Sequence, residues 1–385
     1  MPNSLGKIDL IRDTTAQAIV AQIATANALK RAELKKAGVN LNATDWQSFQ
    51  AMVRSGALLS AYDIGSQFQV TRGDDTLIWD LVHYSKDDDG NYAVLQMHDV
   101  YKNNLQFDAR EALFYAVADL PAGTYHFAID KAEWKAYTGS LQFTTTKAVP
   151  KGGQICFDTA AGSEILPKQA ISYNSQTSTT ALETVTLTVG TTGTDLSTIN
   201  TLNHIQRAVY GSNNYKESAI RQWLNSDKVA GSVWTPQTNY DRPPSWLTTE
   251  AGFMNGLDAD FVAVASPNTQ RIALNTSTDG GGYVDVKDKF FIASRSQLNY
   301  NFENGVDEGE PWTYYTRFRA DAGTGRNDGD DENRVKYHNG SVRHQWLRSP
   351  NYGNAFSTRI VYTGGRVSYT AAQNTFSVAP ACIIR

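Results

Sequence analysis

The densest set of chemically capable side chains is an acidic run at residues 327–333. It contains Asp328, Asp330, Asp331 and Glu332. Alternating carboxylate oxygens are suitable ligands for Ca²⁺, but the twelve-residue EF-hand pattern is absent. A solvated loop is therefore the favoured interpretation, and calcium binding by the 328–332 loop is left open.

The histidines and cysteines lack the spacing that metal binding or nucleophilic catalysis requires. The six histidines never pair at a zinc-ligand spacing, and no HExxH or GxSxG motif occurs. Cys156 and Cys382 lie far apart in the sequence, and we expect two buried free thiols, with a disulfide as the alternative. The run Gly280–Gly282 lacks the Lys-Ser/Thr of a phosphate loop. We therefore expect no catalytic residues, no metal and no cofactor, and the chain is predicted not to be an enzyme.

Composition narrows the classes of partner. The 385 residues carry a net charge of −4, which disfavours binding to nucleic-acid phosphates. The 19 Tyr, 15 Phe and 8 Trp fit either a binding surface or a β-rich core. Residues 1–9 contain no apolar segment, and no stretch approaches the length of a membrane span. We expect a protein synthesised in soluble form in the cytoplasm, with no membrane partner.

Two helices are expected near the N-terminus. Residues 13–37 carry a thin apolar stripe that ends at Gly38. Residues 44–56 place large apolar side chains on one face and end at Gly56. Because the first stripe is too weak to stabilise a lone helix, we expect it to hold a homo-oligomer, most simply a trimer. The alternative is that this helix packs on the β-rich domain of its own chain.

The remainder is predicted to be rich in strands and loops. Alternating or continuous apolar runs from about residue 62 to 104 indicate strands, with KDDDGN as a turn. Residues 105–155 continue as a small antiparallel sheet or sandwich. A helix is expected at 215–227, and residues 231–350 are dense in turns, a feature typical of functional loops.

Several stretches carry a family resemblance. They are YGSNNYKESAIRQWLNSD, TPQTNYDRPPSW, GFMNGLDADF, RIALNTSTDGGGYVDVKDKFFIASRSQ, ENGVDEGEPWTYY, NRVKYHNGSVRHQWLRSPN and VAPACII. Together they resemble the variable proteins of diversity-generating retroelements, especially tail-fibre-type members from phages and prophages. The resemblance is strong over 203–385 and weak over 60–104. It implies a C-type lectin fold whose last strands display residues that are diversified by mutation of template adenines.

The residue types near the C-terminus agree with that implication. Substituting the adenines of an AAC or AAT codon never produces Lys, Met, Trp, Gln or Glu. From their abundance in the chain, about four such residues would be expected between Asn351 and Val378. Gln373 is the one present.

The resemblance also implies individual roles. Residues at diversified positions are assigned to ligand contact, and the residues between them are assigned to the framework. The pair His344-Gln345 departs from the aromatic pair usual before Trp346. His344 therefore joins the contact set, and Gln345 is unexplained. The implied framework residues are Arg359, Val361, Gly365, Val367 and Ala372. The implied ligand-contact residues are His344, Tyr352, Phe356, Ser357, Ile360, Tyr362, Gly364, Ser368, Tyr369, Thr370, Ala371, Asn374 and Phe376.

A surface tolerates arbitrary side chains where these make no core contacts and other residues order the backbone. We expect Trp346, Leu347, Val378 and Ile383 to be buried beside the variable segment. We also expect Arg348 to bind buried carboxylates or carbonyls. The chain lacks the Glu-Pro-Asn, Gln-Pro-Asp and Trp-Asn-Asp motifs of calcium-dependent lectins, so a lectin fold would not by itself imply a sugar ligand.

The expected fold class is α+β: a C-type-lectin-like domain with long irregular loops, an inserted β-rich module and a helical N-terminal segment. The expected domains are a helical attachment or oligomerisation segment at 1–55, the first lectin-like strands at 56–104, the inserted module at 105–200, and the main lectin-like part at 201–385, with the variable region at about 344–378.

The expected function is recognition of a bacterial host surface, protein or glycan, by a hypervariable adhesin at a phage tail-fibre tip. This places the protein in the virion, in contact with other tail components. One alternative is a variable adhesin displayed on a bacterial surface. The other is an enzyme of the formylglycine-generating type, which would need reactive cysteines.

Overall fold

The computed structural model describes most of the chain between Asp45 and Arg385, and the helix expected at 13–37 lies outside the described residues. The described residues are 45–109, 113–116, 119–129, 139–151, 154–159, 181–196, 205–209, 213–235, 243–276, 279–316, 329–353 and 356–385.

The expected α+β, C-type-lectin-like fold class is wrong, because strands dominate the described residues. These contain strands β1–β21 in six sheets of two to seven strands, and their longest helix has ten residues. The loop-dense region 231–350 accounts for part of the difference, since it contributes strands β12–β17.

The largest apolar core surrounds a five-stranded antiparallel sheet in the order β1-β2-β3-β21-β14. The last strand, β21, lies between β3 and β14, and each of its five residues is buried. The end of the chain is thus paired with one of its first described strands. The domain boundaries themselves stay a prediction. The strand bounds are β1 Gln67–Arg72, β2 Asp75–Asp87, β3 Gly90–Met97, β14 Phe290–Ile292 and β21 Pro380–Ile384.

The helix expected at 44–56 is confirmed as α2, Trp46–Ser55. The Asp45 side chain accepts hydrogen bonds from two backbone N–H groups of the first turn, and Gly56 ends the helix with a left-handed φ of 82°. Trp46 is buried, with its ring 6.1 Å from Phe68 of β1 and 4.6 Å from Phe261 of α6. Helix α2 is therefore part of the core, and a cut at residue 55 would remove core side chains.

The helix expected at 215–227 is shorter than predicted, because α5 spans only Ala219–Leu224. Ser218 has extended backbone angles, and its Oγ accepts the N–H of Arg221, so the helix begins after it. The other helices within the described ranges are short as well. They are α3 Leu58–Ala61, α6 Ala259–Val264, α7 Thr313–Thr316, and the 3₁₀ turns Ser245–Thr248 and Glu332–Arg334.

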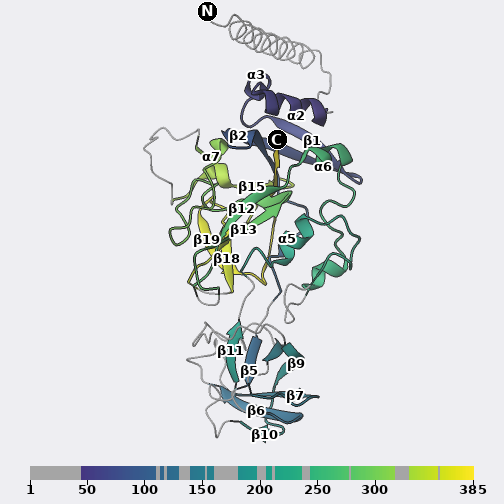
Figure 1. The fold of residues 1–385 in the computed structure, drawn as a ribbon, viewed down its shortest axis with the longest axis vertical. Coiled ribbons are helices and arrows are strands. Elements are labelled where there is room, and N and C mark those ends of the chain that lie inside the picture. The colour runs from purple at the N-terminus through teal and green to yellow at the C-terminus, as the bar shows by residue number, and fades with distance from the viewer. Residues whose placement is uncertain are drawn as a thin grey trace, which may run out of the picture.

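A second sheet has seven strands in the order β10-β6-β7-β9-β8-β5-β11 and lies at the end of the molecule opposite α2 (Figure 1). The expected sheet at 105–155 was antiparallel, but this one is mixed: β8 pairs with β9 in parallel, as β10 does with β6. The strand bounds are β5 Leu113–Ala116, β6 Gly123–Ile129, β7 Gly139–Thr145, β8 Gln154–Thr159, β9 Ala181–Val189, β10 Thr194–Asp195 and β11 Ile205–Val209.

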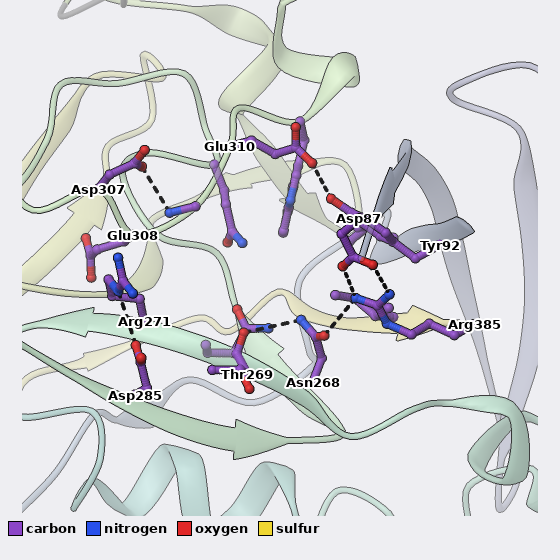
Figure 2. A pocket seen from close by; sticks show the side chains of 16 residues that line it. Asp87, Tyr92, Asn268, Thr269, Arg271, Asp285, Asp307, Glu308, Glu310 and Arg385 are labelled. Carbon is purple, nitrogen blue, oxygen red and sulfur yellow. Dashed lines mark hydrogen bonds and ion pairs between the residues drawn. The ribbon is translucent and has the colours of Figure 1, made fainter. Parts of the chain in front are cut away.

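Smaller sheets border the main core. The hairpin β12–β13 (Asn268–Ala273 and Tyr283–Asp288) flanks a cavity of about 330 Å³. Residues 307–310 and the end of β21 close the other sides of this cavity (Figure 2). Two other pairs are β15–β16 (Lys336–His338 and Ser341–Arg343) and β4–β20 (Leu105–Gln106 and Thr375–Phe376).

The structure also bears on the reactive side chains. Cys382 is a free, fully buried thiol, and burial raises its pKa, which confirms the free-thiol expectation for this cysteine.

Among the described residues, no cluster of three His, Cys, Asp or Glu could hold a metal ion. In the acidic run, the Asp331 side chain accepts the N–H of Asn333 and so caps the 3₁₀ turn that follows it. None of the described helices is long and apolar enough to cross a bilayer.

Candidate functional site

The expected contact residues lie on and around a three-stranded antiparallel sheet, β17-β18-β19. Strand β17, Gln345–Pro350, is buried along its whole length, and β18 is Ser357–Val361. Strand β19, Val367–Ala371, is the edge strand and exposes part of its surface. The sheet therefore rests on the core through β17 and presents β19 to solvent.

The structure divides the thirteen expected contact residues by burial. Ser357 and Ile360 are 3% and 0% exposed, so we remove both from the ligand-facing set. Six are partly buried: His344, Phe356, Ser368, Thr370, Ala371 and Phe376. Five are exposed, and we call them the display surface: Tyr352, Tyr362, Gly364, Tyr369 and Asn374.

Tyr352 shows how an exposed side chain is combined with an ordered backbone. Its side chain is 41% exposed. Its N–H donates to Oε1 of Glu303 at 3.2 Å, and its carbonyl accepts from the N–H of Thr276 at 2.8 Å and from Thr276 Oγ1 at 3.0 Å. The backbone is thus fixed from both sides by groups that do not depend on the Tyr352 side chain.

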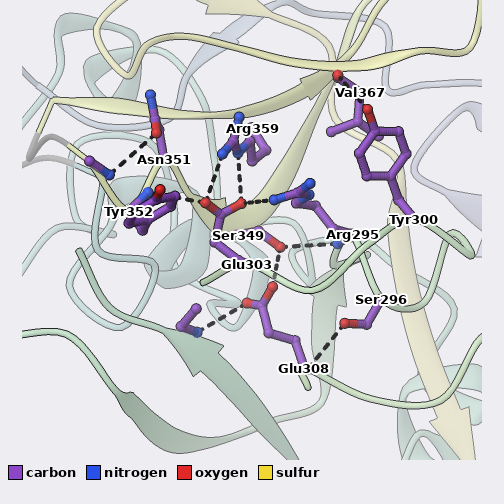
Figure 3. A network of polar contacts seen from close by, with 12 residues as sticks. Arg295, Ser296, Tyr300, Glu303, Glu308, Ser349, Asn351, Tyr352, Arg359 and Val367 are labelled. Carbon is purple, nitrogen blue, oxygen red and sulfur yellow. Dashed lines mark hydrogen bonds and ion pairs between the residues drawn. The ribbon is translucent and has the colours of Figure 1, made fainter. Parts of the chain in front are cut away.

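A buried carboxylate lies beneath this part of the display surface. Glu303 is fully buried and accepts two hydrogen bonds of 2.7 Å from Arg359, while Arg295 donates to its second oxygen (Figure 3). The guanidinium carbon of Arg359 lies 5.5 Å from the centroid of the Tyr369 ring. Two guanidinium groups compensate the buried carboxylate, and one of them supports an exposed tyrosine.

The third exposed tyrosine belongs to a separate aromatic group near the start of β17. The His344 ring lies 5.0 Å from Tyr362 and 5.4 Å from Phe376. Phe376 in turn meets Trp346 edge-on at 5.1 Å, so Phe376 supports the framework more than it displays a variable side chain. Burial lowers the pKa of His344, which favours its neutral form.

The burial expected beside the variable segment is confirmed. Trp346, Leu347, Val378 and Ile383 are each at most 4% exposed. Gly365 has a φ of 82°, and a Cβ there would lie 1.8 Å from the carbonyl oxygen of Asp331, so only glycine fits.

Two buried polar residues complete the support. The fully buried Arg348 donates to the carbonyls of Arg271, Ile292 and Glu308 and to Oε1 of Gln297, at 2.6–3.2 Å. Gln345, unexplained by the sequence, is 1% exposed, and its amide donates to the carbonyl of Arg334 at 2.8 Å. Gln345 is therefore structural.

Sequence reasoning missed Glu303 and Arg295, and only a general signal was available. The segment ENGVDEGEP was expected to be a functional loop, but nothing in it distinguishes Glu303 from its acidic neighbours. Glu303 is buried beside Arg359, which belongs to β18 and lies more than fifty residues further along the chain.

Comparisons with known proteins yielded one family. No curated protein and no solved structure matched the chain. A family model described as "Domain of unknown function (DUF6273)" matches residues 191–385, which include β12–β21 and the whole display surface. The match spans half of the chain, and the protein therefore belongs to the DUF6273 family.

Proposed function

We propose that this protein is a binding protein whose display surface recognises a macromolecule on the surface of a bacterial host. In this proposal it resembles the variable proteins of diversity-generating retroelements and acts at the tip of a phage tail fibre. The observation that carries the proposal is the arrangement at Tyr352 and Tyr369, where the side chains are exposed and the backbone is held by Glu303 and Thr276 at Tyr352 and by pairing with β18 at Tyr369.

That arrangement suits binding for a physical reason. Tyrosine offers a large amphipathic contact area and loses few rotamers when it is immobilised. Tyr352, Tyr362 and Tyr369 are 41%, 40% and 53% exposed. Because Glu303, Thr276 and Trp346 order the backbone and the framework around them, other side chains at the display surface would leave the fold intact. A binding surface whose residues are diversified needs a fold that tolerates such substitutions.

The enzyme alternative gains no support from Cys382. Its thiol is completely buried, and burial raises its pKa, so the nucleophilic thiolate is disfavoured.

Replacing Tyr352, Tyr362 and Tyr369 together with alanine is expected to abolish binding while leaving stability nearly unchanged. Exposed substitutions usually cost within about 0.5 kcal/mol each. The measurements are urea denaturation, and flow cytometry of a panel of bacterial strains incubated with the fluorescently labelled full chain.

Phe376→Ala is the matched control. It should lower the free energy of unfolding by about 2 kcal/mol, because it removes a partly buried ring that packs on Trp346. If the parent binds cells and the triple variant still binds them, the proposal is contradicted. A decrease of several kcal/mol in the free energy of unfolding of the triple variant would contradict it as well.

Diversification has an independent test in the neighbouring DNA. The proposal expects a near-identical template repeat beside a reverse transcriptase gene, with mismatches confined to template adenines. Mismatches spread equally over all four bases would contradict it. A template repeat beside genes for a cell-surface protein instead of tail genes would favour the bacterial adhesin.

The full chain is expected to form a homo-oligomer, most simply a trimer, through its N-terminal segment. Several display surfaces in one oligomer could then bind the same cell together. Such multivalency raises the apparent affinity by a factor of about 10²–10⁴ when the geometry permits simultaneous binding. Light scattering on the full chain and on a chain that starts at Thr44 measures this. The truncation stops before Asp45 because α2 belongs to the core.

A monomeric full chain at micromolar concentration would rule the oligomer out. An unchanged oligomer after truncation would place the interface in the rest of the chain.

A further inference from the structure

Strand β19 is an open edge of the sheet that carries the display surface. It pairs with β18 without a register shift, from Val367 opposite Val361 to Ala371 opposite Ser357. Within the described ranges, no strand pairs with its other side. An edge strand presents unpaired backbone N–H and C=O groups. The direction in which each residue of β19 points these groups therefore decides what the edge can bind.

Hydrogen bonds at the two ends of the β18–β19 ladder fix those directions. At one end, the N–H of Tyr362 donates to the carbonyl of Arg366 at 2.8 Å. At the other end, the N–H of Ala372 donates to the carbonyl of Phe356 at 2.8 Å. Hydrogen-bonded and non-hydrogen-bonded pairs alternate along an antiparallel ladder. The residues of β19 whose backbone groups point away from β18 are therefore Val367, Tyr369 and Ala371.

Part of this outward edge is already occupied. The carbonyl of Val367 accepts from the Tyr300 hydroxyl at 3.4 Å (Figure 3), and Val367 itself is only 6% exposed. The carbonyl of Ala371 accepts the N–H of Asn374 at 2.9 Å. In the part of the chain that the structure describes, no hydrogen bond reaches the remaining outward groups. These are the N–H and C=O of Tyr369, beside its 53% exposed side chain, and the N–H of Ala371.

Two other edge strands, β1 and β13, are protected. On β1, the outer carbonyl of Thr71 accepts the N–H of Asp258 at 2.9 Å. On β13, Asp285 and Lys287 are exposed, and charged side chains disfavour the addition of another strand. Strand β19 reads Val-Ser-Tyr-Thr-Ala, without charge or proline, and is rich in residues that favour strands. The neutral open edge thus coincides with the display surface.

We propose that β19 binds an extended segment of a bacterial surface protein by strand addition, with the main chain of that segment hydrogen-bonded to Tyr369 and Ala371. This inference rests on the proposed function and names the class of its partner. The outward N–H groups of Tyr369 and Ala371 recur at the two-residue repeat of a strand, about 7 Å. An extended polypeptide presents C=O and N–H groups at the same repeat.

Strand addition also suits a surface whose side chains vary. In this binding mode, main-chain hydrogen bonds supply affinity and alternate side chains supply specificity. The C=O of residue 369 is present whichever side chain stands there, and the N–H groups of residues 369 and 371 are lost only to proline. A diversified display surface would thus keep one constant binding element while its specificity changes.

Exchanging one backbone amide for an ester tests the proposal. Replacing Tyr369 in the full chain with its α-hydroxy acid keeps the ring and every hydrogen bond to β18, and removes the outward N–H. Binding is measured by flow cytometry on the strain of the panel that the parent binds most strongly. The half-saturating concentration should rise at least about fivefold, as expected for the loss of one hydrogen bond.

The same exchange at Ser368 is the matched control. The N–H of Ser368 points toward β18, so its removal should lower the urea concentration of half-unfolding. The half-saturating concentration should stay within about twofold of the parent value, because no outward donor is lost.

Treatment of the cells supplies a measurement that requires no variant. Digestion of the cell surface with proteinase K should abolish binding by the parent, whereas periodate oxidation of surface glycans should not. The proposal therefore stays testable if the Tyr369 ester chain fails to fold.

Undiminished binding by a folded Tyr369 ester chain would overturn the inference, and so would binding that survives proteinase K and is lost after periodate. Both results leave the proposed function standing if the triple tyrosine variant has lost binding. A parent chain that binds no strain of the panel would overturn the proposed function and this inference together. A change in the mass of the Tyr369 ester chain in light scattering would mean that the edge pairs two copies of the chain, which would also overturn the inference.

Discussion

Replacing Trp346 with alanine is expected to lower the free energy of unfolding by about 3–5 kcal/mol, as for other buried aromatic residues. Trp346 is 1% exposed, and its Nε1 donates to the carbonyl of Leu105 at 2.8 Å. Its ring contacts Phe107 and Phe376 edge-on, at 5.8 Å and 5.1 Å between centroids. The substitution would leave a cavity and an unpaired carbonyl. Urea denaturation followed by tryptophan fluorescence and by far-UV circular dichroism measures the loss.

Tyr369→Ala is the matched control for Trp346→Ala, because Tyr369 is an aromatic residue of the same small sheet that is 53% exposed. It should change the free energy of unfolding by about 0.5 kcal/mol or less. A Trp346→Ala variant that unfolds at the same urea concentration as the parent would remove Trp346 from the framework and leave the display surface without its main apolar support.

Replacing Arg348 with methionine is also expected to cost about 3–5 kcal/mol, the range for breaking a buried polar network by removing one member. The guanidinium group joins three carbonyls and one amide oxygen from separate segments, at Arg271, Ile292, Gln297 and Glu308. Methionine fills much of the volume but satisfies none of these acceptors. The same urea titration detects the change.

Arg366→Met provides the comparison at an exposed position of the β18–β19 turn, where the expected change is about 0.5 kcal/mol or less. Equal stability of the Arg348→Met variant and the parent would mean that apolar packing replaces the lost hydrogen bonds. The β17 framework would then rest on Trp346 and Leu347 alone.

Local sequence patterns determined the features that neighbouring residues control. Helix α2 was predictable because Asp45 caps it, Gly56 ends it, and its apolar residues recur on one face, all within twelve residues. The burial of Trp346 and Leu347 was predictable because removing two adjacent large apolar side chains from water is favourable. The shortage of certain residue types between Asn351 and Val378 likewise required no tertiary information.

Only the tertiary structure decided which residues of the variable segment face solvent. Ile360 and Tyr369 both looked like contact residues, yet Ile360 is fully buried, and Tyr369 is on the edge strand. The reason is that β18 is covered on both faces, so residue alternation along it does not separate inside from outside.

The same limit applies to the polar support and to the cavity. Glu303 can be buried because Arg295 and Arg359 reach it from different segments, and residues 307–310 line a cavity with the β12–β13 hairpin only in the folded chain. Such pairings depend on contacts between residues that are distant in the chain. A single sequence does not indicate which distant residues will pair, whereas helix caps, turns and apolar periodicity depend on residues that are close together in the chain.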